Sequence, residues 1–156
     1  MNTYLLIKTL HILSSVLMVG TGFGSAFYLF FTHRTRNVQA IAEVSRLVVR
    51  ADTWFTAPAV VFQPLSGWYL ASQAGWTLDT PWIAAALGLY ALAGACWLPV
   101  VALQIRMRNT ARAAVQAGTP LPPAYWRDLR IWTTLGVPAF FAFLALFYLM
   151  VAKPAW

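Results

Sequence analysis

Charge is scarce in this sequence, and acidic charge is the scarcest. Only four of the 156 residues are Asp or Glu, charged residues of all types make up 10% of the chain, and 60% of the residues are hydrophobic. Because soluble domains carry about 25% charged residues, this composition excludes an ordinary water-soluble fold. The chain has only one cysteine and two histidines. No disulfide can therefore form within it, and neither an i, i+4 pair of metal ligands nor a pair of catalytic carboxylates is visible.

The sequence contains long runs of residues without charged side chains. Four runs of about 20 to 25 residues contain no Lys, Arg, Asp or Glu, and they cover residues 9–32, 53–72, 81–105 and 131–152. A helix needs about 20 residues to cross a bilayer, whereas barrel strands would be half as long and alternate in polarity. The sequence therefore predicts an all-α polytopic membrane protein, a four-helix transmembrane bundle forming one domain, 1–156, in contact with the lipid bilayer.

The nine arginines lie in only two of the three connections between these runs. The first connection carries four and the third carries five, whereas the second, residues 73–80, carries only Asp79. The positive-inside rule makes the arginine-rich connections cytoplasmic and puts both termini outside, in a bacterial inner membrane. Because the arginines are scattered and lack an aromatic binding surface, we expect no nucleic-acid partner.

Both arginine-rich connections are predicted to contain helix. In the first, apolar residues recur at steps of three and four, which indicates an amphipathic helix on the cytoplasmic surface or an extension of the second run. Asp52 is predicted to be the N-cap of the second span. Asp52 and Glu43 are both expected to pair with nearby arginines such as Arg50 or Arg106. In the third connection, the helix is expected to continue to Gln116 with its C-cap at Gly118. Kinks are predicted at the prolines inside the runs, which are Pro58, Pro64, Pro99 and Pro138.

His11 is the only ionisable side chain that interrupts the four runs, apart from tyrosine and cysteine. Ionisable groups inside membranes usually face the bundle interior and often mark a functional site. A neutral imidazole can ligate heme iron or copper, or it can simply bond to a neighbouring hydroxyl or carbonyl. His33 lies 22 residues further on, about 33 Å along a helix, so the two cannot share one metal. We expect His33 at the cytoplasmic interface beside Arg34.

Candidate partners of His11 come from depth in the membrane alone. Tyr90 on the third run and Met150 on the fourth lie in the same leaflet as His11, and Met150 is a soft axial ligand for a cofactor. Met18 lies two turns from His11 on nearly the same face, which is the basis of a copper-site hypothesis. Ordinary core packing remains the alternative for both methionines and for Tyr90.

Three further polar side chains lie inside the runs: Gln63, Cys96 and Gln104. Gln63 precedes Pro64 and can bond to a carbonyl that the proline releases, to another helix, or to a substrate such as a quinone. Hydrogen bonding between helices is the alternative for such residues.

Several segments resemble a bacterial family of predicted integral-membrane proteins of unknown function, and the match covers nearly the whole chain. They are LIKTLHIL, HRTR, FTAPAVVFQPLSGWYL, GACWLPVVALQIRMR and LMVAKP. That family is similar to HemJ, the membrane protoporphyrinogen oxidase, and to the CopD-type copper resistance proteins. The resemblance to HemJ implies heme b with His11 as its ligand. The lysine that HemJ carries after a tryptophan at the start of its third helix has no counterpart, since Trp82 is followed by Ile83-Ala84-Ala85-Ala86.

The leading functional hypothesis is a heme b pocket in the outer leaflet, used for electron transfer or for oxidation of a lipophilic substrate. The first alternative is a non-catalytic accessory or assembly subunit of a larger membrane complex, and a homodimer is also compatible with the sequence. The second alternative is a copper-handling membrane protein.

Overall fold

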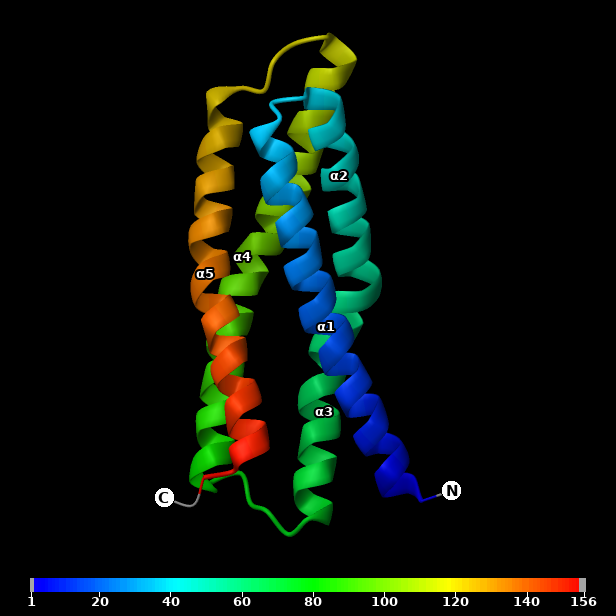
Figure 1. The fold of residues 1–156 in the computed structure, drawn as a ribbon, viewed down its shortest axis with the longest axis vertical. Coiled ribbons are helices and arrows are strands. Elements are labelled where there is room, and N and C mark those ends of the chain that lie inside the picture. Colours follow the sequence, from blue (N-terminus) through cyan, green and yellow to red (C-terminus); the bar gives the residue numbers. More distant parts are fainter. Residues whose placement is uncertain (1, 155–156) are drawn as a thin grey trace.

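The computed structural model describes residues 2–154, and its regular elements are all helical (Figure 1). In chain order they are α1 (Thr3–Arg34), α2 (Val38–Ala51), a π-helical turn η1 (Asp52–Thr56), α3 (Ala57–Gln73), α4 (Pro81–Ala117) and α5 (Pro123–Ala152). The all-α prediction is confirmed for this part of the chain. Gly118 closes α4 in the left-handed conformation, φ 63°, as the sequence predicts.

Three of these helices, α1, α4 and α5, are long and apolar enough to cross a membrane. The fourth predicted span, residues 53–72, falls on η1 and α3. Because α3 by itself has 17 residues, it is shorter than the roughly 20 residues that a spanning helix needs. A fourth crossing by η1 and α3 together, and the predicted kinks, therefore stay predictions.

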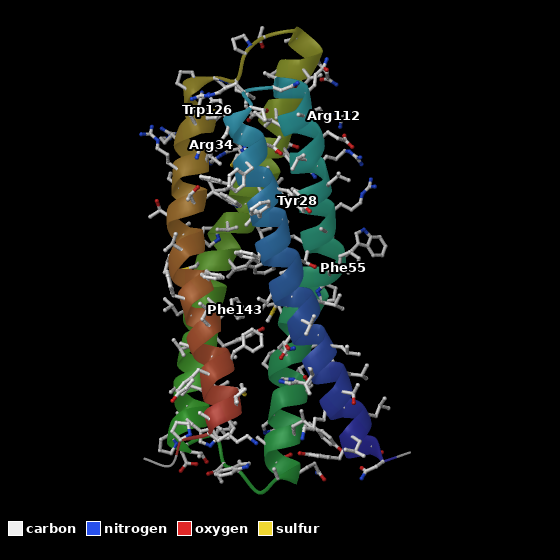
Figure 2. All side chains as sticks on the ribbon, in the orientation of Figure 1. Tyr28, Arg34, Phe55, Arg112, Trp126 and Phe143 are labelled. Atoms are coloured by element: carbon white, nitrogen blue, oxygen red, sulfur yellow. The ribbon has the colours of Figure 1, made fainter. Side chains whose placement is uncertain are left out.

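The helices run alternately along the long axis of the molecule. The start of α1, the end of α5 and the α3–α4 connection lie at one end, whereas the α1–α2 and α4–α5 connections lie at the other (Figure 1). Arg34 and Arg112 lie toward this second end (Figure 2). The two arginine-rich connections are thus at the same end of the bundle.

The main apolar core lies at the arginine-bearing end, where α2 packs between α1 and α4. The spacing that predicts α2 is confirmed, and Asn37 caps the helix by accepting from the Ala40 amide. Ile41 and Val48 are buried in this core, whereas Leu47 from the same predicted face is 47% exposed. The main cluster of buried apolar side chains is therefore found at this end of the bundle.

Asp52 is not a helix N-cap, and that prediction is wrong. The helix continues from α2 into η1, where the amide of Ala57 bonds to the carbonyl of Asp52 five residues back. Such a turn holds one more residue than an α-helical turn, and Pro58, which has no amide to donate, comes two residues after its last member, Thr56. Asp52 lies four residues after Val48 and seven after Ser45, so its side chain continues the buried face of α2 and is 6% exposed.

The predicted ion pair of Glu43 with a nearby arginine is confirmed, although the partner is Arg46, whereas Asp52 forms no ion pair among the described residues. Arg106 donates from Nε to Asp128 Oδ2 at 2.6 Å, not to Asp52. Glu43 pairs with Arg46 on the exposed face of α2, and hydrogen bonding from this guanidinium lowers the pKa of the Glu43 carboxyl.

His33 directly precedes Arg34 toward the arginine-bearing end of the bundle (Figure 2), so its place at the cytoplasmic interface stays a prediction, but the side chain is buried within the protein. Its side chain is 3% exposed. Nδ1 bonds to the carbonyl oxygen of Leu29, so Nδ1 carries the proton and Nε2 accepts from the Tyr125 hydroxyl at 2.6 Å. The partner comes from α5, 92 residues away in the sequence, and it removes the need for a headgroup contact.

Candidate functional site

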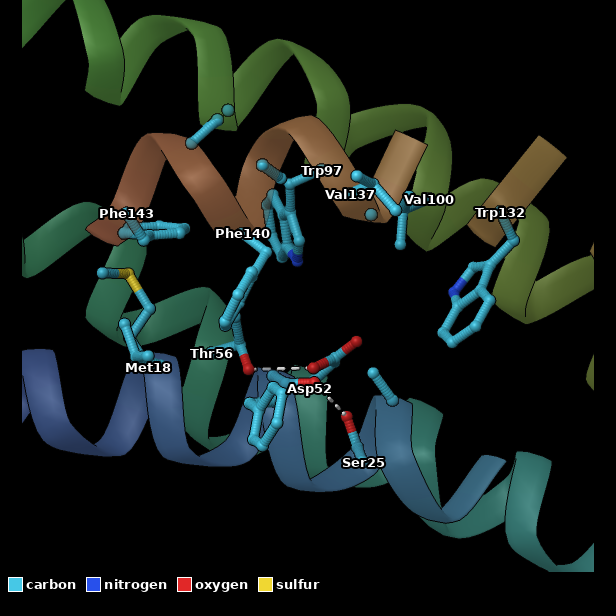
Figure 3. A pocket seen from close by; sticks show the side chains of 18 of the residues that line it. Met18, Ser25, Asp52, Thr56, Trp97, Val100, Trp132, Val137, Phe140 and Phe143 are labelled. Atoms are coloured by element: carbon cyan, nitrogen blue, oxygen red, sulfur yellow. Dashed lines mark hydrogen bonds between the residues drawn. The ribbon is translucent and has the colours of Figure 1, made fainter. Parts of the chain in front are cut away.

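A cavity of about 370 Å³ lies between α1, η1, α3, α4 and α5. Most of its wall is apolar, with Val100 from α4 and Val137 and Phe140 from α5 (Figure 3). Its size falls within the range of small-molecule sites in proteins, about 300 to 1,000 Å³.

The cavity reaches the outer surface of the bundle between α1 and α5. Phe23 on α1 and Phe140 on α5 both line it, and they are 58% and 37% exposed. Their rings stack with centroids 5.5 Å apart and planes inclined by 25°. Two partly exposed aromatic rings from opposite helices thus stand between the cavity and the surroundings of the bundle.

A polar group from the π-helical turn faces into this apolar space. Thr56 Oγ1 donates to Asp52 Oδ1 at 2.8 Å, and both side chains line the cavity (Figure 3). Gln104 of α4 lies beside the same carboxyl. Among the residues that the structure describes, Asp52 forms no ion pair. The π-turn therefore supplies a carboxyl and a hydroxyl to an otherwise apolar cavity.

Three further polar atoms at the cavity lack a hydrogen-bond partner within residues 2–154. They are Trp97 Nε1, Gln104 Oε1 and Trp132 Nε1. Gln104 is 5% exposed and Trp132 is 6% exposed, and the indole nitrogens of Trp97 and Trp132 face the open centre of the cavity (Figure 3). Buried polar groups in proteins are nearly always paired, so this cluster of two donors and one acceptor needs an explanation.

His11 lies outside this cavity, between α1 and α3. Its Nδ1 is 2.7 Å from Ser66 Oγ, and Ser66 Oγ donates its single proton to the carbonyl of Phe62 at 2.6 Å. His11 Nδ1 must therefore be the donor, which leaves a lone pair on Nε2. Gln63 donates to the carbonyl of His11 at 2.8 Å, and Gly67 lies against the ring.

Gln63 thus bonds between helices, which was one of its predicted roles. These contacts also join two of the segments that carry the family resemblance, LIKTLHIL and the FQPLSG part of the second run.

Tyr90 does not face His11 but completes the backbone bonding of α3. Its hydroxyl donates to the carbonyl of Val60 at 2.6 Å. Pro64, four residues after Val60, has no amide to donate to that carbonyl. The carbonyl that Pro64 releases therefore accepts from Tyr90 of α4. One prediction for Gln63 was that it would bond to this carbonyl, but Gln63 bonds to the carbonyl of His11 instead.

The remaining predicted site residues are dispersed. Met18 lines the cavity and is 5% exposed, Met150 is 37% exposed on α5, and Cys96 is a buried free thiol that does not line the cavity. Within residues 2–154, no group of three or more His, Cys, Asp or Glu side chains is arranged to hold a metal ion. Of the predicted residues, the cavity brings together Met18, Tyr90 and Gln104.

Sequence reasoning missed Asp52, Trp97 and Trp132 as cavity residues. One usable signal existed, because Trp97 and Gln104 are seven residues apart and therefore share a helix face. A second signal existed for Asp52, which lies four residues after Val48 and seven after Ser45 and therefore continues the buried face of α2.

Residues 5–154 match the model of a protein family described as predicted integral membrane protein (DUF2269). No curated protein and no solved structure matches the chain.

Proposed function

Because the chain belongs to the DUF2269 family of predicted integral membrane proteins, we propose that it acts within the bilayer as a binding protein for a small lipophilic molecule. The observation that carries this proposal is the cavity with its unpaired polar atoms, Trp97 Nε1, Gln104 Oε1 and Trp132 Nε1. Each unpaired buried group costs about 1 to 3 kcal/mol, a cost that a bound ligand with complementary atoms removes.

The route into the cavity supports a ligand drawn from the membrane. Phe23 and Phe140, which stand between the cavity and the exterior, belong to two of the helices that are apolar enough to cross the bilayer. A molecule entering between α1 and α5 thus comes from lipid, and its apolar part matches walls of valine and phenylalanine.

The test fills the cavity and leaves the rest of the fold unchanged. Gly94 lines the cavity, and a Cβ added there meets no atom within 4 Å, so Gly94→Leu puts a side chain into the open space. Gly88→Leu is the matched control, since Gly88 lies on the same helix, also has room for a Cβ, and does not line the cavity.

The probe is a long-chain fatty alcohol that carries a photoreactive diazirine, added to protein in nanodiscs and cross-linked by light. We expect labelled peptides from the cavity-lining parts of α4 and α5 in the wild type and in Gly88→Leu, and loss of that labelling in Gly94→Leu. Labelling that is spread over the lipid-facing surface and insensitive to Gly94→Leu would overturn the proposal.

A heme ligand at His11 is the second candidate function, favoured by one observation. The bond from Nδ1 to Ser66 fixes the imidazole tautomer that leaves Nε2 able to coordinate iron, as metal-bound histidines require. The proposed second ligands fit less well, since the Tyr90 hydroxyl is bonded to Val60 and Met150 is partly exposed on α5.

The absorption spectrum of the protein purified in mild detergent tests this candidate. A Soret band that shifts on dithionite reduction and is lost in His11→Ala supports heme. Colourless protein that takes up Cu(I) stoichiometrically, less so in Met18→Ala, supports the copper hypothesis instead. Colourless, metal-free protein that co-purifies with a second membrane protein supports the accessory-subunit hypothesis.

We also propose that η1 and α3 together make a fourth crossing of a bacterial inner membrane, with the arginine-bearing end in the cytoplasm. The arrangement of connections at the two ends of the bundle supports this topology (Figure 1). Labelling of intact cells with an impermeant maleimide tests it. Thr77→Cys in the α3–α4 connection should react from outside, whereas Thr119→Cys in the α4–α5 connection should react only after lysis.

A further inference from the structure

We infer that the ligand of the cavity is a lipid-soluble hydroquinone, and that the protein binds this reduced form in preference to the corresponding quinone. The inference rests on the proposed function and concerns the head group that the cavity selects. It is argued from the hydrogen-bonding capacity of the side chains around the cavity.

The polar groups of the cavity are of two kinds. Trp97 Nε1 and Trp132 Nε1 only donate, so each needs an acceptor on the ligand. Gln104 Oε1 only accepts, so it needs a donor on the ligand. The carboxyl of Asp52 already accepts from Thr56 Oγ1. A ligand that satisfies the three unpaired atoms must carry at least one donor and two acceptors, which two hydroxyl groups provide.

The positions of these groups favour two separated hydroxyls over one. Trp97 and Gln104 are seven residues apart on α4, which puts their Cα atoms about 10 Å apart along the helix axis and places the two residues at different levels of the cavity. Asp52 and Trp132 come from η1 and α5 and lie on other walls of the same cavity (Figure 3). A ring with hydroxyls on opposite edges offers the required separation.

The walls favour an aromatic ring as the carrier of those hydroxyls. Phe23, Trp97, Trp132 and Phe140 all line the cavity, and flat rings stack on or pack edge-to-face against such side chains. The route between α1 and α5 favours an apolar tail that remains in the lipid. These features together describe a membrane-soluble hydroquinone.

The preference for the reduced form follows from the unpaired acceptor, Gln104 Oε1. A quinone carbonyl accepts from an indole as well as a hydroxyl does, but it donates nothing, so Gln104 Oε1 stays unpaired beside it. Leaving a buried acceptor unpaired weakens binding. We therefore expect the hydroquinone to bind about ten-fold more tightly than the quinone.

The experiment compares a decyl-chain benzoquinol and its benzoquinone, each titrated anaerobically into protein in nanodiscs. Gln104→Leu removes an acceptor and should weaken the hydroquinone about ten-fold while leaving the quinone unchanged. Trp132→Phe removes a donor and should weaken both forms equally. Trp82→Phe is the matched control, since Trp82 Nε1 is also buried without a partner but lies away from the cavity, and it should change neither affinity.

The outcomes separate this inference from the proposed function. Equal binding of both forms, abolished by Gly94→Leu, would overturn the preference for hydroquinone and leave the binding function standing. Binding of neither form, with no cavity labelling by the diazirine alcohol, would overturn both. Preference for the hydroquinone that survives Gln104→Leu would overturn the assigned acceptor.

Discussion

The hydroxyl of Tyr90 stabilises the fold by donating to a backbone carbonyl that Pro64 leaves without a helical donor. This role can be tested as an energetic coupling between Tyr90 and Pro64. Tyr90 donates to the Val60 carbonyl at 2.6 Å, and Pro64 is the residue whose amide would otherwise fill that position. In Tyr90→Phe the carbonyl loses the hydroxyl that donates to it. In Pro64→Ala it regains the amide of residue 64, and the phenol becomes dispensable.

The expected size follows from two ranges. An unpaired buried acceptor costs about 1 to 3 kcal/mol in proteins generally, whereas interhelical bonds in membranes average about 0.6 kcal/mol and reach about 1.7. Tyr90 is half-buried, so we expect Tyr90→Phe to cost about 1 kcal/mol in the Pro64 background. A protein of this size would then lose about 2 to 4 °C in Tm.

Reversible unfolding in mixed micelles, as the fraction of a denaturing detergent is raised, gives the four free energies of the double-mutant cycle. We expect Tyr90→Phe to be nearly neutral when residue 64 is alanine, which makes the coupling about 1 kcal/mol. Pro64 is exposed, so its replacement disturbs little packing. Equal costs of Tyr90→Phe in both backgrounds would refute the reasoning, because the hydroxyl would then be doing something unrelated to the proline.

Two further predictions concern the ion pair of Asp128 and the ring of His11. Arg106→Gln should cost about 1 to 2 kcal/mol in the same unfolding assay, because it leaves Asp128, which is 5% exposed, without its counter-ion. The cost is lower than for a fully buried pair because the arginine side chain is itself about half exposed to water. Arg46→Gln, at an exposed pair, should cause no measurable change. Gly67→Ala should be tolerated, because the added Cβ meets His11 Cε1 at an ordinary contact distance of 3.4 Å. The two further methyl groups of Gly67→Val should crowd the ring and cost about 1 to 3 kcal/mol of stability. Equal effects of the two substitutions would contradict the packing described.

The parts of the fold that hydropathy and periodicity encode were predictable from the sequence. The runs at 9–32, 81–105 and 131–152 fall within α1, α4 and α5, and the apolar spacing after Asn37 predicts α2. Gly118 ends α4 because its lack of a side chain permits positive φ. These features depend on neighbours in the sequence, so a single chain suffices to find them.

The features that sequence reasoning missed depend on contacts between distant segments. His33 is buried because Tyr125, on another helix, offers a hydroxyl to Nε2. Tyr90 matches His11 in depth, yet depth says nothing about the direction in which a side chain points around its helix. The polar end of the cavity combines Asp52 of η1 with Gln104 of α4, and no spacing within either segment links them.

The single surplus residue in η1 also bears on where the long helical rod formed by α2, η1 and α3 can lose a residue. A π-turn spreads nearly the same rotation over one more residue than an α-turn, so deleting one residue here would let the rod continue as a regular α-helix with little change in the angular phase between its halves. Deleting one residue from α2 or α3 instead would rotate one half by about 100°, and the faces carrying Ile41 and Ser66 could no longer meet α4 and α1 at once. The loss of one exposed member of η1, Thr53, Trp54 or Phe55, is therefore absorbed better than a deletion in either flanking helix.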